Sequence, residues 1–540
     1  MTEIISFDRL PGGSRLFLDY LYDPQHVGAF FAWPFRSARE FQSCARLLAD
    51  QPFDRAALIA ILARQNREFE TDGAAFRNID RLSRNDTLTI FTGQQVGLFG
   101  GPLYTIYKAL GAIGWAKKLE EILERPIVPV FWLAADDHDF AEVRWLAYPG
   151  LDNRPHRSFY EPEFEPDRVP TSLIRYDFGI DRIHEQWRAE RLATEFSPAV
   201  DSALTESFHA GATLATAFGR WMARVFAGTG LVLFSPSDPA AKRPAVPLFE
   251  RELRCPERSA RALELVNLHL AESGYHLQVS HQRSHTHLFH FNGRRVPLDR
   301  TPDGQLTDGQ QTRPPEWWIE KLHEQPENFS PDVLLRPVLQ NYLFPNVAYV
   351  GGPSEVAYWA QSRALFELNE VVQPVVVNRP FVTLVESKVR RAMEKLRVAV
   401  ADVLADPEAV VNAVTQRTFP VDLQEAFAET RKCFAERMEG LERSVAAFEP
   451  TLEKTFGLAA GKINTELTAL EKKAFQAHKK KNEIIREQVY KISAHLLPEG
   501  KLQERVYGLP YYLNKYGFEL ISHLQEHIRH DLGDHQFIDL

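Results

Sequence analysis

The segment 92–102, TGQQVGLFGGP, has the residue types of a ligand-binding loop. It follows the apolar run 88–91 and precedes a helical pattern over 103–123. Glycine lets backbone approach a ligand, and free N–H groups at a helix start attract an anion. The sequence has neither a GxGxxG fingerprint nor a P-loop here, so a tight turn without a ligand is the alternative. The candidate contacts are Thr92, Gly93, Gln94, Gln95, Gly97, Gly100 and, on the helix, Lys108.

Four polar residues, Asp136, Asp137, His138 and Asp139, end the next apolar run, 127–133. Three carboxylates cannot all be buried without partners, so the cluster must face solvent, a cation or a ligand. A carboxylate beside histidine can raise its pKa and fix its tautomer, which suits a general base. We expect His138 to act as a base for a cationic amine, or to orient it, with Asp137 and Asp139 holding its positive charge. A metal site, or simple capping of the following helix, is the alternative.

Two further strand ends carry candidate residues. Ser354 and Glu355 follow Val350-Gly351-Gly352-Pro353, and Asn378 and Arg379 end the run 371–377. Arg379 could pair with a substrate carboxylate, or with a structural acid. Ser354 could equally cap a helix, because the Gly-x-Ser-x-Gly motif of hydrolases is absent.

Five histidines cluster near a predicted hairpin, at positions 276, 281, 285, 287 and 290. His285 and His287 would share one strand face, a spacing that suits metal ligands. Polar alternation on a half-exposed strand explains them equally well, and we expect no metal. The three cysteines lie far apart, which disfavours a cysteine-based zinc site and a disulfide framework.

The elements that position these residues indicate an α/β fold. Continuous apolar runs separated by helical patterns are typical of a parallel sheet covered on both faces. We therefore predict a Rossmann-like core over 1–383, with insertions at about 150–230 and 240–330. Within the second insertion, the alternation at 287–291 followed by Asn292-Gly293 predicts a hairpin with a type I′ turn.

Residues 384–500 have a different composition, rich in Ala, Glu, Lys, Leu and Arg. Apolar residues recur at steps of three and four from Leu423 to Phe448 and again from Ile463, which predicts a coiled coil. Pro450 separates two antiparallel helices of about 45 residues, an arm of about 65 Å. A third helix is expected over 386–404. Such an arm suits formation of a homodimer or contact with a partner.

The tail, 501–540, combines basic and aromatic residues. Packing on the core or on the coiled coil is one interpretation. Binding of a nucleotide, ATP or ADP with magnesium, is the other, and its candidate residues are Lys501, Arg505, Asn514, Lys515 and Tyr516.

The overall composition is that of a soluble globular protein. The chain has 540 residues and a formal charge of −9, which argues against nucleic acid and anionic membranes as partners. It shows no secretion signal at its start and no apolar run of 18 residues. We expect a cytoplasmic protein with reduced thiols.

Several segments together resemble the bacillithiol biosynthesis cysteine-adding enzymes, the BshC family. They are 10–20 (LPGGSRLFLDY), 92–95 (TGQQ), 101–108 (GPLYTIYK), 129–132 (PVFW), 137–139 (DHD), 335–338 (LRPV), 348–353 (AYVGGP), 355–359 (EVAYW), 501–505 (KLQER) and 513–517 (LNKYG). They span nearly the whole chain, and the TGQQ and DHD blocks are specific. Tyr104, within the segment 101–108, joins the candidate substrate ligands.

The resemblance implies a Rossmann-like core with a dimeric coiled-coil domain. It also implies a ligase that joins L-cysteine to glucosaminyl-malate through an amide bond, with a nucleotide pocket near the coiled coil. Two other functions remain as alternatives: a coiled-coil dimer that only binds a metabolite, and a nucleotidyltransferase with another substrate.

Overall fold

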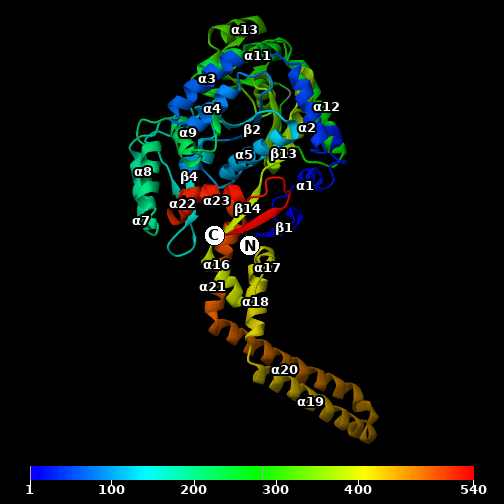
Figure 1. Cartoon of the computed structure of the whole chain (residues 1–540). Coiled ribbons are helices and arrows are strands. Elements are labelled where there is room, and N and C mark those ends of the chain that lie inside the picture. The colour runs from blue at the N-terminus through cyan, green and yellow to red at the C-terminus, as the bar shows by residue number, and fades with distance from the viewer. Residues whose placement is uncertain (1, 283) are drawn as a thin grey trace. The chain divides into compact units, whose positions relative to one another are not determined.

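The computed structural model describes residues 2–282 and 284–540 (Figure 1). The chain forms two compact units. The first comprises Met1–Leu384 with Glu499–Ile538, and the second comprises Val385–Pro498 with Asp539–Leu540. Within the described residues, no helix combines the length and the apolar character needed to cross a bilayer.

A five-stranded parallel sheet forms the centre of the first unit. Its order is β13-β12-β2-β3-β6, so the strand of this sheet that comes first in the sequence, β2, lies in the middle, and the order reverses between β2 and β12. In such sheets, ligands bind outside the carboxyl ends of the strands at the reversal point. The Rossmann-like class is confirmed, and the apolar runs 88–91, 127–133 and 371–377 each contribute a strand. The five strands are β2 (Leu88–Gln94), β3 (Ile127–Leu133), β6 (Val232–Phe234), β12 (Asn346–Gly351) and β13 (Val375–Asn378).

Both faces of this sheet are buried, which explains its continuous apolar strands. Leu88 and Ile90 pack against α2 (Ala38–Ala49) and α5 (Tyr104–Leu123). The intervening strand residue Phe91 instead contacts Phe344, which follows α14 (Arg336–Leu343), with ring centroids 4.7 Å apart. Alternate side chains of β2 therefore support opposite layers.

The first inserted region, between β3 and β6, contains a two-stranded hairpin and three main helices. These are β4 (Trp145–Pro149), β5 (Pro155–Phe159), α7 (Gly179–Glu190), α8 (Ser197–Ser207) and α9 (Leu214–Val225).

The second inserted region, between β6 and β12, contains an antiparallel sheet of order β10-β9-β8-β7-β11. Its strands are β7 (His285–Phe291), β8 (Arg295–Arg300), β9 (Leu306–Thr307), β10 (Thr312–Arg313) and β11 (Phe329–Pro331). The accompanying helices include α10 (Pro239–Lys242), α11 (Val246–Arg254), α12 (Pro256–Glu272) and α13 (Pro315–Glu324).

The predicted hairpin is present as β7 and β8, but its predicted turn type is wrong. A type I′ turn needs positive φ at both central residues. Gly293 has φ of 100°, whereas Asn292 is not left-handed, and Phe291 pairs with Arg295. The connection is therefore a three-residue loop, with glycine at its left-handed position.

The second unit contains the predicted coiled-coil hairpin. Its two long helices are α19 (Val421–Phe448) and α20 (Glu453–Lys481), joined by a short turn at Pro450–Leu452 and bridged by an ion pair between Arg431 and Glu471. The helix α21 (Glu483–Leu496) follows and contacts α16 (Ser387–Leu396), α17 (Val400–Ala405) and α18 (Pro407–Arg417).

Two details of this unit differ from expectation. The long helices have 28 and 29 residues, not 45, which gives about 43 Å at 1.5 Å per residue. Asn482 leaves helical geometry and separates α20 from α21. The predicted single helix over 386–404 is two helices, because Arg397 adopts the left-handed conformation that ends α16.

The tail returns to the first unit. Its strand β15 (His535–Asp539) pairs with β1 (Thr2–Ile5) in a three-stranded sheet with β14 (Phe381–Val385). Glu504, fully buried, accepts two hydrogen bonds from Arg379, at 2.9 and 2.5 Å, and one from the backbone of Val382 at 3.0 Å. This buried ion pair fixes the tail to the last strands of the core.

We expect Glu504→Gln to destabilise the first unit by about 3–5 kcal/mol, because it leaves the buried Arg379 guanidinium without its compensating charge. Asp531→Asn is the matched control. It breaks the exposed Lys118–Asp531 pair, at 2.8 Å, and should cost less than about 1 kcal/mol. Urea unfolding measures both, and equal small losses would contradict a stabilising role for the buried pair.

Candidate active site

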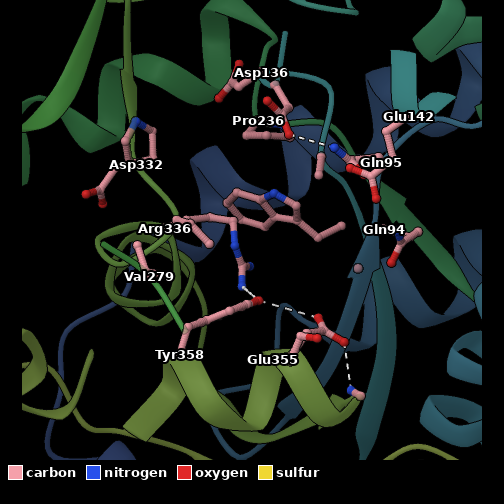
Figure 2. A pocket seen from close by; sticks show the side chains of 18 of the residues that line it. Gln94, Gln95, Asp136, Glu142, Pro236, Val279, Asp332, Arg336, Glu355 and Tyr358 are labelled. Carbon is pink, nitrogen blue, oxygen red and sulfur yellow. Dashed lines mark hydrogen bonds between the residues drawn. The ribbon is translucent and has the colours of Figure 1, made fainter. Parts of the chain in front are cut away.

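A cavity of about 610 Å³ opens at the carboxyl ends of β2, β3 and β12 (Figure 2). Its position is the one that the strand reversal predicts. The loop after β2 forms one wall. Gly93 is required there, because a Cβ at this position would lie 2.8 Å from the Trp132 carbonyl oxygen on β3.

The buried Lys108 ammonium connects two walls of the cavity. It donates to the Gly93 carbonyl at 2.8 Å and to Gln94 Oε1 at 2.7 Å, and it pairs with Glu355 at 2.6 Å. Glu355 lies in the first turn of α15 (Pro353–Leu368) and also accepts from Tyr349 and from the Gly352 N–H. Although burial raises the pKa of Glu355, Lys108 and these donors lower it overall, so the carboxylate stays charged.

The acid–histidine cluster after β3 is divided among different roles. Asp136 pairs with the buried Lys242 at 2.7 Å, and Asp137 accepts from Gln95 Nε2 at 2.7 Å. Asp139 is exposed and accepts from the Glu142 N–H, so it caps the short helix α6 (Phe140–Val143). Asp139 therefore caps a helix, as the alternative interpretation of this cluster predicted, while Asp136 and Asp137 line the cavity.

His138 also lines the cavity, and Arg295 fixes its tautomer. The Arg295 Nη1 atom lies 3.1 Å from His138 Nδ1. A guanidinium can only donate, so Nδ1 accepts and the neutral ring carries its proton on Nε2. Burial, and then the Arg295 charge, lower the pKa of His138. The ring is thus arranged to donate from Nε2, which supports an orienting or charge-stabilising role more than that of a base.

Two arginines in the cavity wall, the buried Arg295 and the half-buried Arg336, have only neutral hydrogen-bond partners. Arg336 donates to Tyr358 Oη at 2.9 Å (Figure 2). It also donates to Gln340 Oε1 at 3.1 Å. Arg295 donates to Ser330 Oγ and to the Pro331 carbonyl, both at 2.9 Å, besides its contact with His138. Among the described residues, neither guanidinium has a carboxylate within 4 Å. A buried cation without an acid favours binding of an anion.

Glu142 supplies the opposite charge in the same cavity. Burial raises its pKa, a shift that the Gln95 hydrogen bond and nearby groups do not cancel. A carboxylate with a raised pKa is a better proton acceptor near neutral pH. Glu142 is therefore a further candidate for a general base.

The predicted ligand residues fall into two groups. Those lining the larger cavity are Gly93, Gln94, Gln95, Tyr104, Lys108, Asp136, Asp137, His138, Ser354, Glu355, Arg379 and Arg505. Gly97 and Lys501, together with Arg505 and Glu142, line an adjoining cavity of about 250 Å³.

The remaining predicted residues are not among those that line the two cavities, and they contact other parts of the protein. Thr92 donates to the Val350 carbonyl, and Asn378 donates to the Leu532 carbonyl. Gly100 lies against Trp221, and Asn514 accepts from Arg191 and Ser197. Lys515 donates to Tyr511 at 2.7 Å, and Tyr516 ends α22 (Leu509–Tyr516).

The sequence interpretation missed Arg295, Arg336, Glu142, Lys242 and Asp332, which all lie in or beside the larger cavity. Only Arg336 had a signal, because it belongs to the LRPV segment. The others come from the inserted regions or from a helix that follows the polar cluster, and their spacing along the chain forms no motif.

Comparisons with known proteins agree over both units. Residues 2–380 match the family model described as Bacillithiol biosynthesis BshC, N-terminal Rossmann-like domain. Residues 382–540 match the C-terminal coiled-coil domain of the same family.

Three relatives carry the name "Putative cysteine ligase BshC". The protein of Salinibacter ruber is 32% identical over 524 residues, covering 97% of this chain and 96% of the relative. Those of Symbiobacterium thermophilum and Koribacter versatilis are each 33% identical and cover 96% and 97% of this chain, and 97% of each relative. With both domain models matched in order, this chain belongs to the BshC family of bacillithiol biosynthesis.

Proposed function

We propose that this protein is a ligase that joins L-cysteine to glucosaminyl-malate through an amide bond, the last step in forming bacillithiol. The observation that carries this proposal is the pair formed by the buried Arg295 and the half-buried Arg336, two cations without acid partners in one cavity. Malate contributes two carboxylates, which match two guanidinium groups in number and charge. The family membership supports the same substrates.

The sugar amine would bind on the acidic side of the cavity. Asp137 and Glu142 offer carboxylates to an ammonium group, and Glu142 could remove its proton before attack. The amine nitrogen then forms a bond to the carbonyl carbon of the activated cysteine carboxyl group, and the bond from that carbon to the oxygen of the activating phosphate group breaks, so that this group leaves with the electron pair. His138, protonated on Nε2, would stabilise the negative charge that develops on the carbonyl oxygen.

The cysteine carboxylate needs activation, because its direct condensation with an amine is unfavourable in water. We propose ATP, accompanied by magnesium, as the energy source. Lys501 and Arg505, at the smaller cavity beside Gly97, are the candidate nucleotide contacts. We further propose that the protein is cytoplasmic, where its three cysteines stay reduced.

The first test incubates the purified chain with L-cysteine and glucosaminyl-malate, with and without ATP and magnesium, and detects the thiol product by mass spectrometry.

Arg336→Met should reduce kcat/KM for glucosaminyl-malate about 10- to 100-fold, the loss expected for charged hydrogen bonds of about 1.5–3 kcal/mol. Arg294→Met is the control, because Arg294 is exposed and pairs with Asp167 at the surface.

No product from folded wild-type protein under either condition would favour the metabolite-binding dimer. Nucleotide turnover without transfer of cysteine would favour a nucleotidyltransferase. An unchanged rate in Arg336→Met would contradict the role of this arginine in binding malate.

The role of His138 is tested by two substitutions at one position. We expect His138→Ala to reduce product formation on the order of 100-fold or more, the loss typical of one donor to a developing oxyanion. His138→Gln should retain at least a tenth of the wild-type rate, because its amide can donate from nearly the same place as Nε2. If both variants are equally inactive while folded, His138 acts as a base instead.

We also propose a homodimer formed through the coiled-coil hairpin. Leu441, Ile463 and Leu470 belong to the predicted heptad seams, yet about half of each side chain is exposed in the single chain. A second hairpin packing on these residues would bury them.

Sedimentation equilibrium should therefore give twice the chain mass for the wild type and a shift toward the single-chain mass for Leu441→Glu combined with Ile463→Glu. Lys462→Glu, at an exposed position beside Ile463, should leave the dimer intact. A wild-type protein of single-chain mass would contradict this proposal.

A further inference from the structure

Two histidines and one aspartate meet at the edge of the larger cavity, where neither the proposed substrate contacts nor the proposed catalytic groups use them. His281 lies in the segment between α12 and β7, His287 lies on β7, and Asp332 follows β11. Because β7 and β11 are antiparallel neighbours, and the Asp332 N–H donates to the His287 carbonyl at 2.9 Å, the backbone fixes two of the three residues.

The side chains converge on one carboxylate oxygen. Asp332 Oδ2 lies 2.8 Å from His287 Nδ1 and 3.8 Å from His281 Nε2. The two imidazole rings stack with centroids 4.3 Å apart. One nitrogen or oxygen atom from each residue lies within 4.8 Å of the others.

The other oxygen of Asp332 is already engaged. Oδ1 accepts from the N–H groups of Leu334 and Leu335, at 2.9 and 2.8 Å. These two bonds orient the carboxylate and leave Oδ2 directed at the imidazoles. Secondary contacts of this kind hold ligating side chains in place in known metal sites.

One of the converging atoms also lacks an ordinary partner. The Nε2 atom of His281 is buried and has no hydrogen-bond partner among residues 2–282 and 284–540. Leaving a buried polar nitrogen unpaired costs about 1–3 kcal/mol. A simple histidine–aspartate ion pair accounts for one nitrogen of His287 but leaves the His281 nitrogen unexplained.

We propose that His281, His287 and Asp332 bind one divalent transition-metal cation of the zinc or cobalt class. Two imidazoles and one carboxylate form a ligand set that such cations accept at about 2.0–2.2 Å, with ligand atoms about 3–3.5 Å apart. The distances of 2.8 and 3.8 Å to Asp332 Oδ2 lie on either side of this range, and small side-chain rotations would bring the three atoms, which lie within 4.8 Å of one another, to it. Magnesium is disfavoured, because it prefers an all-oxygen site.

Three protein ligands leave at least one coordination position open. His281 and Asp332 both line the 610 Å³ cavity, and Figure 2 shows Asp332 and Val279 at its edge. The open position would therefore face the cavity and take a water molecule or a donor atom of a bound ligand. The exposed thiols Cys255 and Cys433 are not part of the cluster.

The test uses the full chain, freed of metal by a chelator and then titrated with Co²⁺. Elemental mass spectrometry measures the ratio of bound metal to protein, and the visible d–d absorption bands of Co²⁺ report its coordination number. We expect one equivalent with a low-coordinate spectrum, at least tenfold weaker binding in His281→Gln, and retained binding in His276→Gln. His276 is the matched control because it is an exposed histidine of the same segment.

Asp332→Asn gives a second variant that keeps the side-chain shape, and circular dichroism checks that each protein is folded. Absence of binding by the wild type, or equal binding by His281→Gln, would overturn the proposal and leave a buried histidine–aspartate ion pair only. The readout is bound metal and not product, so its failure would leave the proposed ligase activity unaffected.

Discussion

Burial of charge at the carboxyl edge of the central sheet is the constraint on which the rest of the structure depends. An unpaired charge in such a place is expensive, so each one requires a partner. Lys108 is matched by Glu355, Lys242 by Asp136, and Arg379 by Glu504. These three pairs join α5 to α15, the second inserted region to β3, and the tail to β13. These pairs position the cavity walls. The cavity arginines that belong to none of them, Arg295 and Arg336, remain available to bind a ligand.

The sequence was sufficient for the fold, because the signal for a doubly covered sheet is local. A strand such as 127–133 must be apolar on both sides. Its length and the helical patterns that flank it identify it as a buried strand, without any knowledge of the strands that pair with it. Boundaries that depend on one backbone conformation were less predictable. Arg397 is left-handed and divides a helix whose residue pattern continues across it.

The site was only partly predictable, for a physical reason. Gln95, Asp137 and Lys108 follow strand ends, and parallel strands bring their ends to one edge, so topology alone groups them. Arg295 and Arg336 reach the same cavity from an inserted sheet and from a helix. Nothing in the spacing of residues along the chain reports that an arginine lacks an acid, since this property depends on every side chain around it.

The tail shows that a segment shared with a family can contain both residues that line a ligand cavity and residues that stabilise the fold. Within 501–505, Glu504 is fully buried against Arg379, whereas Lys501 and Arg505 line the smaller cavity. Within 513–517, Asn514 accepts hydrogen bonds from Arg191 and Ser197. Gly517 has a φ of 71°, and a Cβ atom at this position would lie 2.9 Å from the ring of Phe196. The second segment therefore holds the tail against α8, while the first does two things at once. A single five-residue block both attaches the tail and presents two cations to the cavity, so the same contact that stabilises the core also places its candidate nucleotide ligands.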